Sequence, residues 1–212
     1  MRSWTLLPLA SLLFFPAVAG IDEKKEPESA RARILIAYHS SEGHTRQMAE
    51  AVARGARSVG GVEVKIQLVR DAAEDDVLAA DAIILGSPVY NANVAPPVQE
   101  FINRWPFRGA PLKDKLGAAF VSAGGISAGE ELTQLSLLHS MLVFGMIVVG
   151  GPEWRGAFGA SAVVAEDPSG KDKEKKESVA DHYLKKGEGL GRRVAELSVK
   201  WKRGLAAIPP AK

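Results

Sequence analysis

The sequence predicts an α/β fold in which helices cover both faces of a doubly wound parallel sheet of five strands, in the order 2-1-3-4-5. Two observations lead to this prediction. Short apolar runs alternate along the chain with segments whose apolar residues recur at helical spacing, which is typical of a parallel sheet. The first run, residues 34–37, is apolar without interruption, as expected of a strand that is covered on both faces.

Five segments have the composition of strands, and helical patterns separate them. Residues 62–68 alternate between apolar and polar side chains and therefore fit an edge strand. The other strand-like runs are 34–37, 82–85, 118–121 and 146–149. The expected helices cover residues 45–56, 75–80, 97–105, 132–142 and 190–201. In a sheet of this order, ligands bind beyond the carboxyl ends of the strands.

The two ends of the chain differ in composition from the segment between them. Residues 1–19 combine an early arginine, an apolar stretch and a final Ala-Val-Ala, which is the pattern of a cleaved secretory signal peptide. An uncleaved anchor and a wrongly assigned start codon are the alternatives. We expect a polar linker at 20–31, one domain at 32–205 and a disordered tail at 206–212. A real signal peptide implies a periplasmic or secreted protein, and its absence a cytoplasmic one.

The composition excludes several classes of function. A net charge of +2 provides no basic surface for nucleic acid. The chain has no cysteine, which excludes disulfides, thiol catalysis and thiolate metal ligands. The four histidines, His39, His44, His139 and His182, lack the spacing of a metal site, so we expect no bound metal.

The turn after the first strand has the features of a phosphate site. It carries Ser40, Gly43 and Thr45 and leads into a helix, whose first N–H groups and dipole attract anions. A dinucleotide-binding turn would need G-x-G-x-x-G, and a P-loop would need a lysine. Neither pattern is present. The turn therefore predicts a phosphate monoester held by hydroxyls and backbone N–H groups.

Two further turns carry ligand-type residues at the same edge of the predicted sheet. The turn after the third strand reads GSPVYNANVAPP, and the turn after the fourth reads SAGGISAGE. Tyr90 is suited to stack on a flat ring, although an ordinary surface aromatic is the simpler interpretation of that residue alone. Taken with the first turn, these sequences predict a bound flavin mononucleotide (FMN).

These motifs resemble the flavodoxin family, whose first loop has a pattern like S/T-x-x-G-x-T, matched by Ser40, Gly43 and Thr45. The fold expected is therefore flavodoxin-like. Within that family the chain looks most like the WrbA-type NAD(P)H:quinone oxidoreductases, related to NAD(P)H-dependent FMN reductases. YHSSEGHT, GSPVYNAN, the FGM segment at 144–146 and FGAS at 158–161 carry this resemblance, which extends over residues 32–203.

The resemblance implies a set of FMN-binding residues. The group expected around the flavin phosphate is Ser40, Glu42, Gly43, His44 and Thr45. The group expected along the flavin ring is Pro88, Val89, Tyr90, Asn91, Ala92 and Asn93. The group expected to close the site is Ser122, Ala123, Gly124 and Gly125. The loop after the third strand and Val143-Phe144 depart from the family pattern near the expected substrate position, so flavin binding is better supported than the substrate.

The resemblance also implies a reaction. Electrons would pass from NAD(P)H through FMN to a quinone or a similar small acceptor, and no side chain is expected to act as a catalytic acid or base. The protein would be a homo-oligomer if it follows the family. One alternative is an electron carrier of the flavodoxin type that meets a redox partner protein, and another is a flavodoxin-like module without cofactor. Such carriers are strongly acidic, so the near-neutral charge favours the enzyme. Nicotinamide cofactors are held in the cytoplasm, which conflicts with export.

Overall fold

The computed structural model describes residues 31–165 and 178–207. The expected signal peptide, most of the linker and the end of the expected tail lie outside the described residues, as does most of KDKEKKES, a run of mixed charge at 171–178. The last helix continues to Ala207, two residues beyond the expected domain end at 205. In the described part of the chain, no helix is both long enough and apolar enough to cross a membrane.

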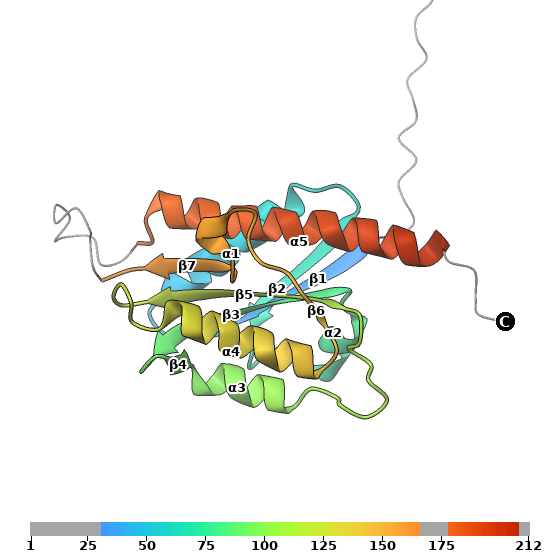
Figure 1. The fold of residues 1–212 in the computed structure, drawn as a ribbon, viewed down its shortest axis with the longest axis horizontal. Coiled ribbons are helices and arrows are strands. Elements are labelled where there is room, and N and C mark those ends of the chain that lie inside the picture. The colour runs from blue at the N-terminus through green and yellow to red at the C-terminus, as the bar shows by residue number, and fades with distance from the viewer. Residues whose placement is uncertain (1–30, 166–177, 208–212) are drawn as a thin grey trace, which may run out of the picture.

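The main sheet follows the predicted order. Its strands are β1 (Ala32–Tyr38), β2 (Val62–Leu68), β3 (Ala82–Tyr90), β5 (Leu116–Ala123) and β6 (Ile147–Val148). They lie in the order β2-β1-β3-β5-β6, and every neighbouring pair among them is parallel. The predicted α/β fold with a doubly wound parallel sheet is therefore confirmed (Figure 1).

Two strands were not predicted, so within the described residues the sheet has seven strands instead of five. The short β4 (Asn93–Val94) pairs antiparallel with the end of β3. The fifth position of the sheet is shared: β6 pairs with the beginning of β5, and β7 (Ala160–Val163) pairs with its end. The predicted strand at 146–149 is therefore only two residues long. Gly150, Gly151 and Pro152 follow it, and a proline cannot donate to a sheet ladder.

Helices form a layer on each face of the sheet. Helices α1 (His44–Arg57) and α5 (Asp181–Ala207) lie on one face. Helices α3 (Pro96–Asn103) and α4 (Glu130–Val143) lie on the other, together with α2 (Glu74–Ala79). Figure 1 shows α5 on the opposite side of the sheet from α3 and α4. A separate apolar cluster fills each of the two interfaces between helices and sheet.

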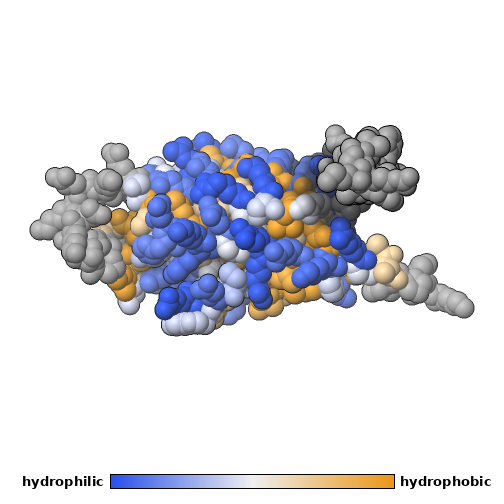
Figure 2. All heavy atoms as spheres, turned by 90° about the horizontal axis from the view of Figure 1, so that it is seen from above, coloured by the Kyte–Doolittle hydropathy of each residue, from blue (hydrophilic) through white to orange (hydrophobic). Residues whose placement is uncertain are grey.

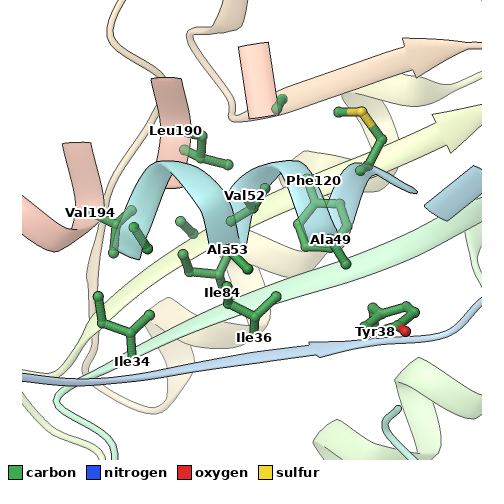
Figure 3. Packing of buried hydrophobic residues seen from close by; sticks show 14 of the residues in the cluster. Ile34, Ile36, Tyr38, Ala49, Val52, Ala53, Ile84, Phe120, Leu190 and Val194 are labelled. Carbon is green, nitrogen blue, oxygen red and sulfur yellow. The ribbon is translucent and has the colours of Figure 1, made fainter. Parts of the chain in front are cut away.

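Helix α1 lies between the sheet and α5. Most of its buried side chains are small, and alanine is the commonest residue among them, because the helix must contact neighbours on both sides. In Figure 3, Val52 lies near Leu190 and Val194 of α5, while Ile36 and Ile84 of the sheet lie on the other side of α1. All five of these residues are at most 1% exposed.

Two glycines bring α1 and α5 into backbone contact. A Cβ atom at Gly191 of α5 would lie 1.9 Å from the carbonyl oxygen of Val52, and one at Gly55 of α1 would lie 1.9 Å from that of Glu188. No flexible side chain can move aside at either position, because the obstacle is the backbone of the facing helix. The distance between α1 and α5 therefore depends on these two glycines.

We expect Gly191→Ala to destabilise the protein. The added methyl group must push α1 and α5 apart, and overpacking of this kind costs about 2 kcal/mol. For a chain of this size that loss lowers Tm by about 4–8 °C, measured by circular dichroism. Gly204→Ala in the same helix is the control. A Cβ atom there meets nothing within 4 Å, so better helix propensity should stabilise by about 0.5–1 kcal/mol. An unchanged Tm for Gly191→Ala would contradict the argument.

Candidate functional site

A cleft of about 300 Å³ opens where β1, β3 and β5 end. Because these strands are parallel, their carboxyl ends meet at one edge of the sheet, and the loops that follow them form the walls. The cleft is lined by Ser40, Ser41, Glu42, His44, Thr45, Pro88, Val89, Tyr90, Ser122, Ala123, Gly124, Val164 and Ala165. The three predicted loops therefore come together at one place.

The first loop leads into α1 through Gly43, whose φ of 92° is in the left-handed region that favours glycine. Gly43 has no side chain with which to cap the helix. The hydroxyl of Ser40 takes that role, because its Oγ accepts hydrogen bonds from the N–H groups of Gly43 (3.1 Å) and Arg46 (3.3 Å). The first turn of α1 contains no acidic residue, so the positive end of the helix dipole faces the cleft without a competing carboxylate from that turn.

A buried hydrogen bond joins the first loop to the end of β5. The hydroxyl oxygens of Thr45 and Ser122 lie 2.8 Å apart, and the two residues are 2% and 6% exposed. Both residues line the cleft. This bond therefore fixes the N-terminus of α1 against the neighbouring wall of the site.

Tyr90 lies at the mouth of the cleft and is 39% exposed. Its hydroxyl is 2.9 Å from the hydroxyl of Ser41, which also lies 3.2 Å from Nε2 of His39. The rings of His39 and Tyr90 meet edge to face, with centroids 6.5 Å apart. Burial lowers the pKa of His39, and the charge of Arg70 lowers it further, so the neutral imidazole is favoured in this network. These contacts connect the first and third loops across the opening.

The segment that follows Tyr90, at the end of the predicted loop after the third strand, turns away from the cleft. Asn91 and Ala92 have φ values of 51° and 60°, and they form the two-residue turn of a β-hairpin between β3 and β4. Ser87 holds the base of this hairpin, because its Oγ accepts a hydrogen bond from the N–H of Ala95 at 3.0 Å. Asn91, Ala92 and Asn93 therefore do not line the cleft, in contrast to Pro88, Val89 and Tyr90.

Most of the other predicted site residues do line it. Ser40, Glu42, His44 and Thr45 come from the first loop, and Ser122, Ala123 and Gly124 come from the end of β5. Gly43 and Gly125 were predicted but do not line the cleft: Gly43 shapes the turn, and Gly125 lies one position beyond the wall.

Sequence reasoning missed three residues of the wall. Ser41 is adjacent to Ser40 in the quoted motif, and its sequence neighbourhood could have indicated it. Val164 and Ala165 directly follow β7, a strand that was not predicted, so no signal placed them at this edge. Among the described residues, no group of three histidine, aspartate or glutamate side chains is placed to hold a metal ion.

Comparison of the sequence with known proteins identifies the family of this chain. Residues 69–160 match the family described as NADPH-dependent FMN reductase. A flavodoxin from Aquifex aeolicus (strain VF5) is 34% identical over 172 residues, which cover 77% of this chain and 85% of that protein. An NAD(P)H dehydrogenase (quinone) from Azorhizobium caulinodans is 35% identical over 164 residues, which cover 66% of this chain and 81% of that protein. The chain belongs to the flavodoxin-like WrbA/FMN reductase family.

Solved structures share the fold of this family member. A flavodoxin, WrbA-like protein from Agrobacterium tumefaciens superposes with a TM-score of 0.64 at 23% identity, over 80% of this chain and 98% of that chain. A flavodoxin from the domain Archaea superposes with a TM-score of 0.60 at 24% identity, over 78% and 98% of the two chains. The resemblance stated from YHSSEGHT and GSPVYNAN is thus confirmed at the level of family and fold.

We expect Thr45→Val to destabilise the flavin-free protein by about 1–3 kcal/mol, because it leaves the buried Ser122 hydroxyl without its partner. Urea unfolding measures this change. The double variant Thr45→Val/Ser122→Ala is the control: removing both hydroxyls together should recover most of the lost stability, because no buried polar group is then orphaned. Equal losses in the single and double variants would show that the bond has no such role.

Proposed function

We propose that the protein binds FMN in the cleft beyond β1, β3 and β5 and uses it as an NAD(P)H-dependent oxidoreductase for quinone-like acceptors. The observation behind this proposal is that three loops and the N-terminus of α1, whose first turn has no acidic residue, meet in one cleft. The names of the relatives support the donor and the acceptor, since the Azorhizobium caulinodans protein is an NAD(P)H dehydrogenase (quinone).

The residues of the cleft fit the two ends of FMN. At one end, the dipole of α1 and the hydroxyls of the first loop favour a phosphate. At the other, the partly exposed ring of Tyr90 offers a flat apolar surface beside Pro88 and Val89. FMN, when bound, supplies a ring that accepts two electrons from a nicotinamide and passes them to an acceptor. The chain itself binds and orients, and no side chain is assigned as an acid or base.

The second candidate function is an electron carrier without a small-molecule substrate of its own. The relative from Aquifex aeolicus, which is named a flavodoxin, favours it. The net charge of +2 favours the enzyme, because a carrier that docks on basic partners needs an acidic surface. The partner is accordingly a small-molecule acceptor such as a quinone, or a redox protein in the alternative.

Anaerobic addition of NADH or NADPH to the FMN-loaded protein distinguishes the two functions. We expect rapid loss of the yellow flavin absorbance, and its return when a quinone is added. Flavin that stays oxidised with both nicotinamides would favour the carrier. A protein that binds no FMN would contradict the central proposal.

Variants of Tyr90 test the fit of the cleft in the same experiment. Tyr90→Ala removes the ring and should weaken FMN binding about tenfold, measured by fluorescence titration. Tyr90→Phe keeps the ring and loses only the hydrogen bond to Ser41, so it is the matched control and should bind FMN nearly as tightly as the original protein. Similar FMN affinities in the two variants would show that the ring of Tyr90 does not contribute to FMN binding.

We also propose that residues 1–19 direct export. The apolar stretch and the Ala-Val-Ala sequence before Gly20 support this. When the full chain is produced in bacteria, we expect a periplasmic protein whose N-terminal residue, determined by mass spectrometry, is Gly20. A cytoplasmic protein that retains residues 1–19 would contradict it. An exported enzyme would require an electron donor other than cytoplasmic NAD(P)H. Export of a protein whose flavin NAD(P)H reduces would therefore require a separate account of its donor.

A further inference from the structure

A second cleft, of about 340 Å³, lies between α5 and the loop that joins β6 to β7. Its wall on the helix consists of His182, Lys185, Lys186 and Gly189, which share one side of α5 because they are spaced by three, four and seven residues. Its wall on the loop consists of Gly151, Pro152, Glu153, Arg155, Gly156 and Gly159. None of these residues lines the first cleft.

The loop wall is held in a defined shape close to α5. A short 3₁₀ helix, η2 (Trp154–Gly156), lies at its tip, and the N–H of Gly151 donates to the carbonyl oxygen of Gly156 at 2.8 Å. A Cβ atom at Gly189 would lie 3.1 Å from Cγ of Pro152, so the two walls nearly touch there. The hollow is therefore built by backbone contacts as well as by exposed side chains.

The charge of this cleft is positive. Arg155, Lys185 and Lys186 line it against a single carboxylate, that of Glu153, and none of these four residues takes part in an ion pair within the described part of the chain. The nearby Glu188 does not offset them, because its Oε1 lies 3.0 Å from Nε of Arg54 on α1. The three cations that line the cleft thus exceed the one carboxylate that lines it.

Aromatic rings orient two of the cations. The guanidinium carbon of Arg155 lies 5.3 Å from the ring centroid of Trp154, which is 81% exposed, and Nζ of Lys186 lies 5.4 Å from that of Tyr183. A cation that already rests on a ring loses less freedom when a ligand binds. Figure 2 shows the molecule from above, from the side on which α5 lies in Figure 1, and hydrophilic residues cover most of that surface, with apolar patches between them.

We propose that this second cleft binds a small molecule that carries a diphosphate group. Two linked phosphates match three cations that come from both walls, and phosphate oxygens accept charge-assisted hydrogen bonds from lysine and arginine. The inference rests on this cleft alone and is independent of the proposed flavin function.

Pyrophosphate binding to the full-length protein tests the proposal, measured by isothermal titration calorimetry with FMN bound, so that the phosphate end of the first cleft is filled. We expect saturable binding that weakens with added salt and is tighter than the binding of sulfate. In two-dimensional NMR spectra, the amide signals of Gly151 and Gly156 should shift. Absence of binding, or equal binding of sulfate, would overturn the proposal. Shifts confined to Gly43 and Thr45 would assign the anion to the first cleft and overturn it too.

Two lysines of α5 give a matched pair of variants. Lys185→Gln removes a cation from the cleft and should weaken pyrophosphate binding about tenfold, because one charge-assisted contact is lost. Lys200→Gln removes another exposed lysine of the same helix that does not line the cleft, and it should leave the affinity unchanged. Both side chains are exposed, so neither change affects folding. Equal affinities in the two variants would overturn the proposal.

Discussion

Backbone contact between α1 and α5 determines how α1 is placed against the sheet. At Gly55 and Gly191 the two helices meet backbone to backbone, so their separation is fixed by van der Waals contact between main-chain atoms. Helix α1 lies between α5 and the sheet, and its N-terminus forms the base of the first cleft. The far end of α5 is held separately, by Nζ of Lys202 at 2.8 Å from Oδ2 of Asp81. The position of the α1 N-terminus at the cleft is therefore set by packing at Val52 and Gly55, further along the same helix.

The sequence was sufficient to predict those parts of the fold where a single local pattern, such as an apolar run, is strong. The buried central strands are uninterrupted apolar runs, and few other structures accommodate such runs in a chain with alternating helices. It was insufficient for β7, because Ala160–Val163 contains small residues that give neither a strong apolar run nor a clear alternation. That strand exists because the end of β5 presents a free edge after β6 stops, which is a property of the assembled sheet and of no local segment.

In the candidate site, too, some features follow from the local sequence and others depend on contacts between elements of the folded chain. The rule that parallel strands end at one edge was enough to bring the three loops together. It could not show that the third loop folds back as a hairpin, since Ala92 adopts a left-handed φ that alanine seldom takes. The reason lies in the neighbouring element: a Cβ atom at Gly129, which precedes α4, would lie 2.5 Å from Cβ of Ala92. The hairpin and the start of α4 therefore pack closely against each other, and the local sequence of neither segment indicates this contact.

Helix α5 serves two surfaces at once, and its sequence explains how. Gly187, Leu190, Gly191 and Val194 form the buried stripe against α1, whereas Lys185 and Lys186, which line the second cleft, lie on another side of the helix. A lysine on the buried stripe would have to lose its hydration inside an apolar cluster, which is costly, so charge is restricted to the outer sides. The packing that fixes α1 at the first cleft thus also fixes the positions of Lys185 and Lys186. A change that separates the two helices must therefore disturb both clefts, whereas a change of charge on the outer side can alter only the second.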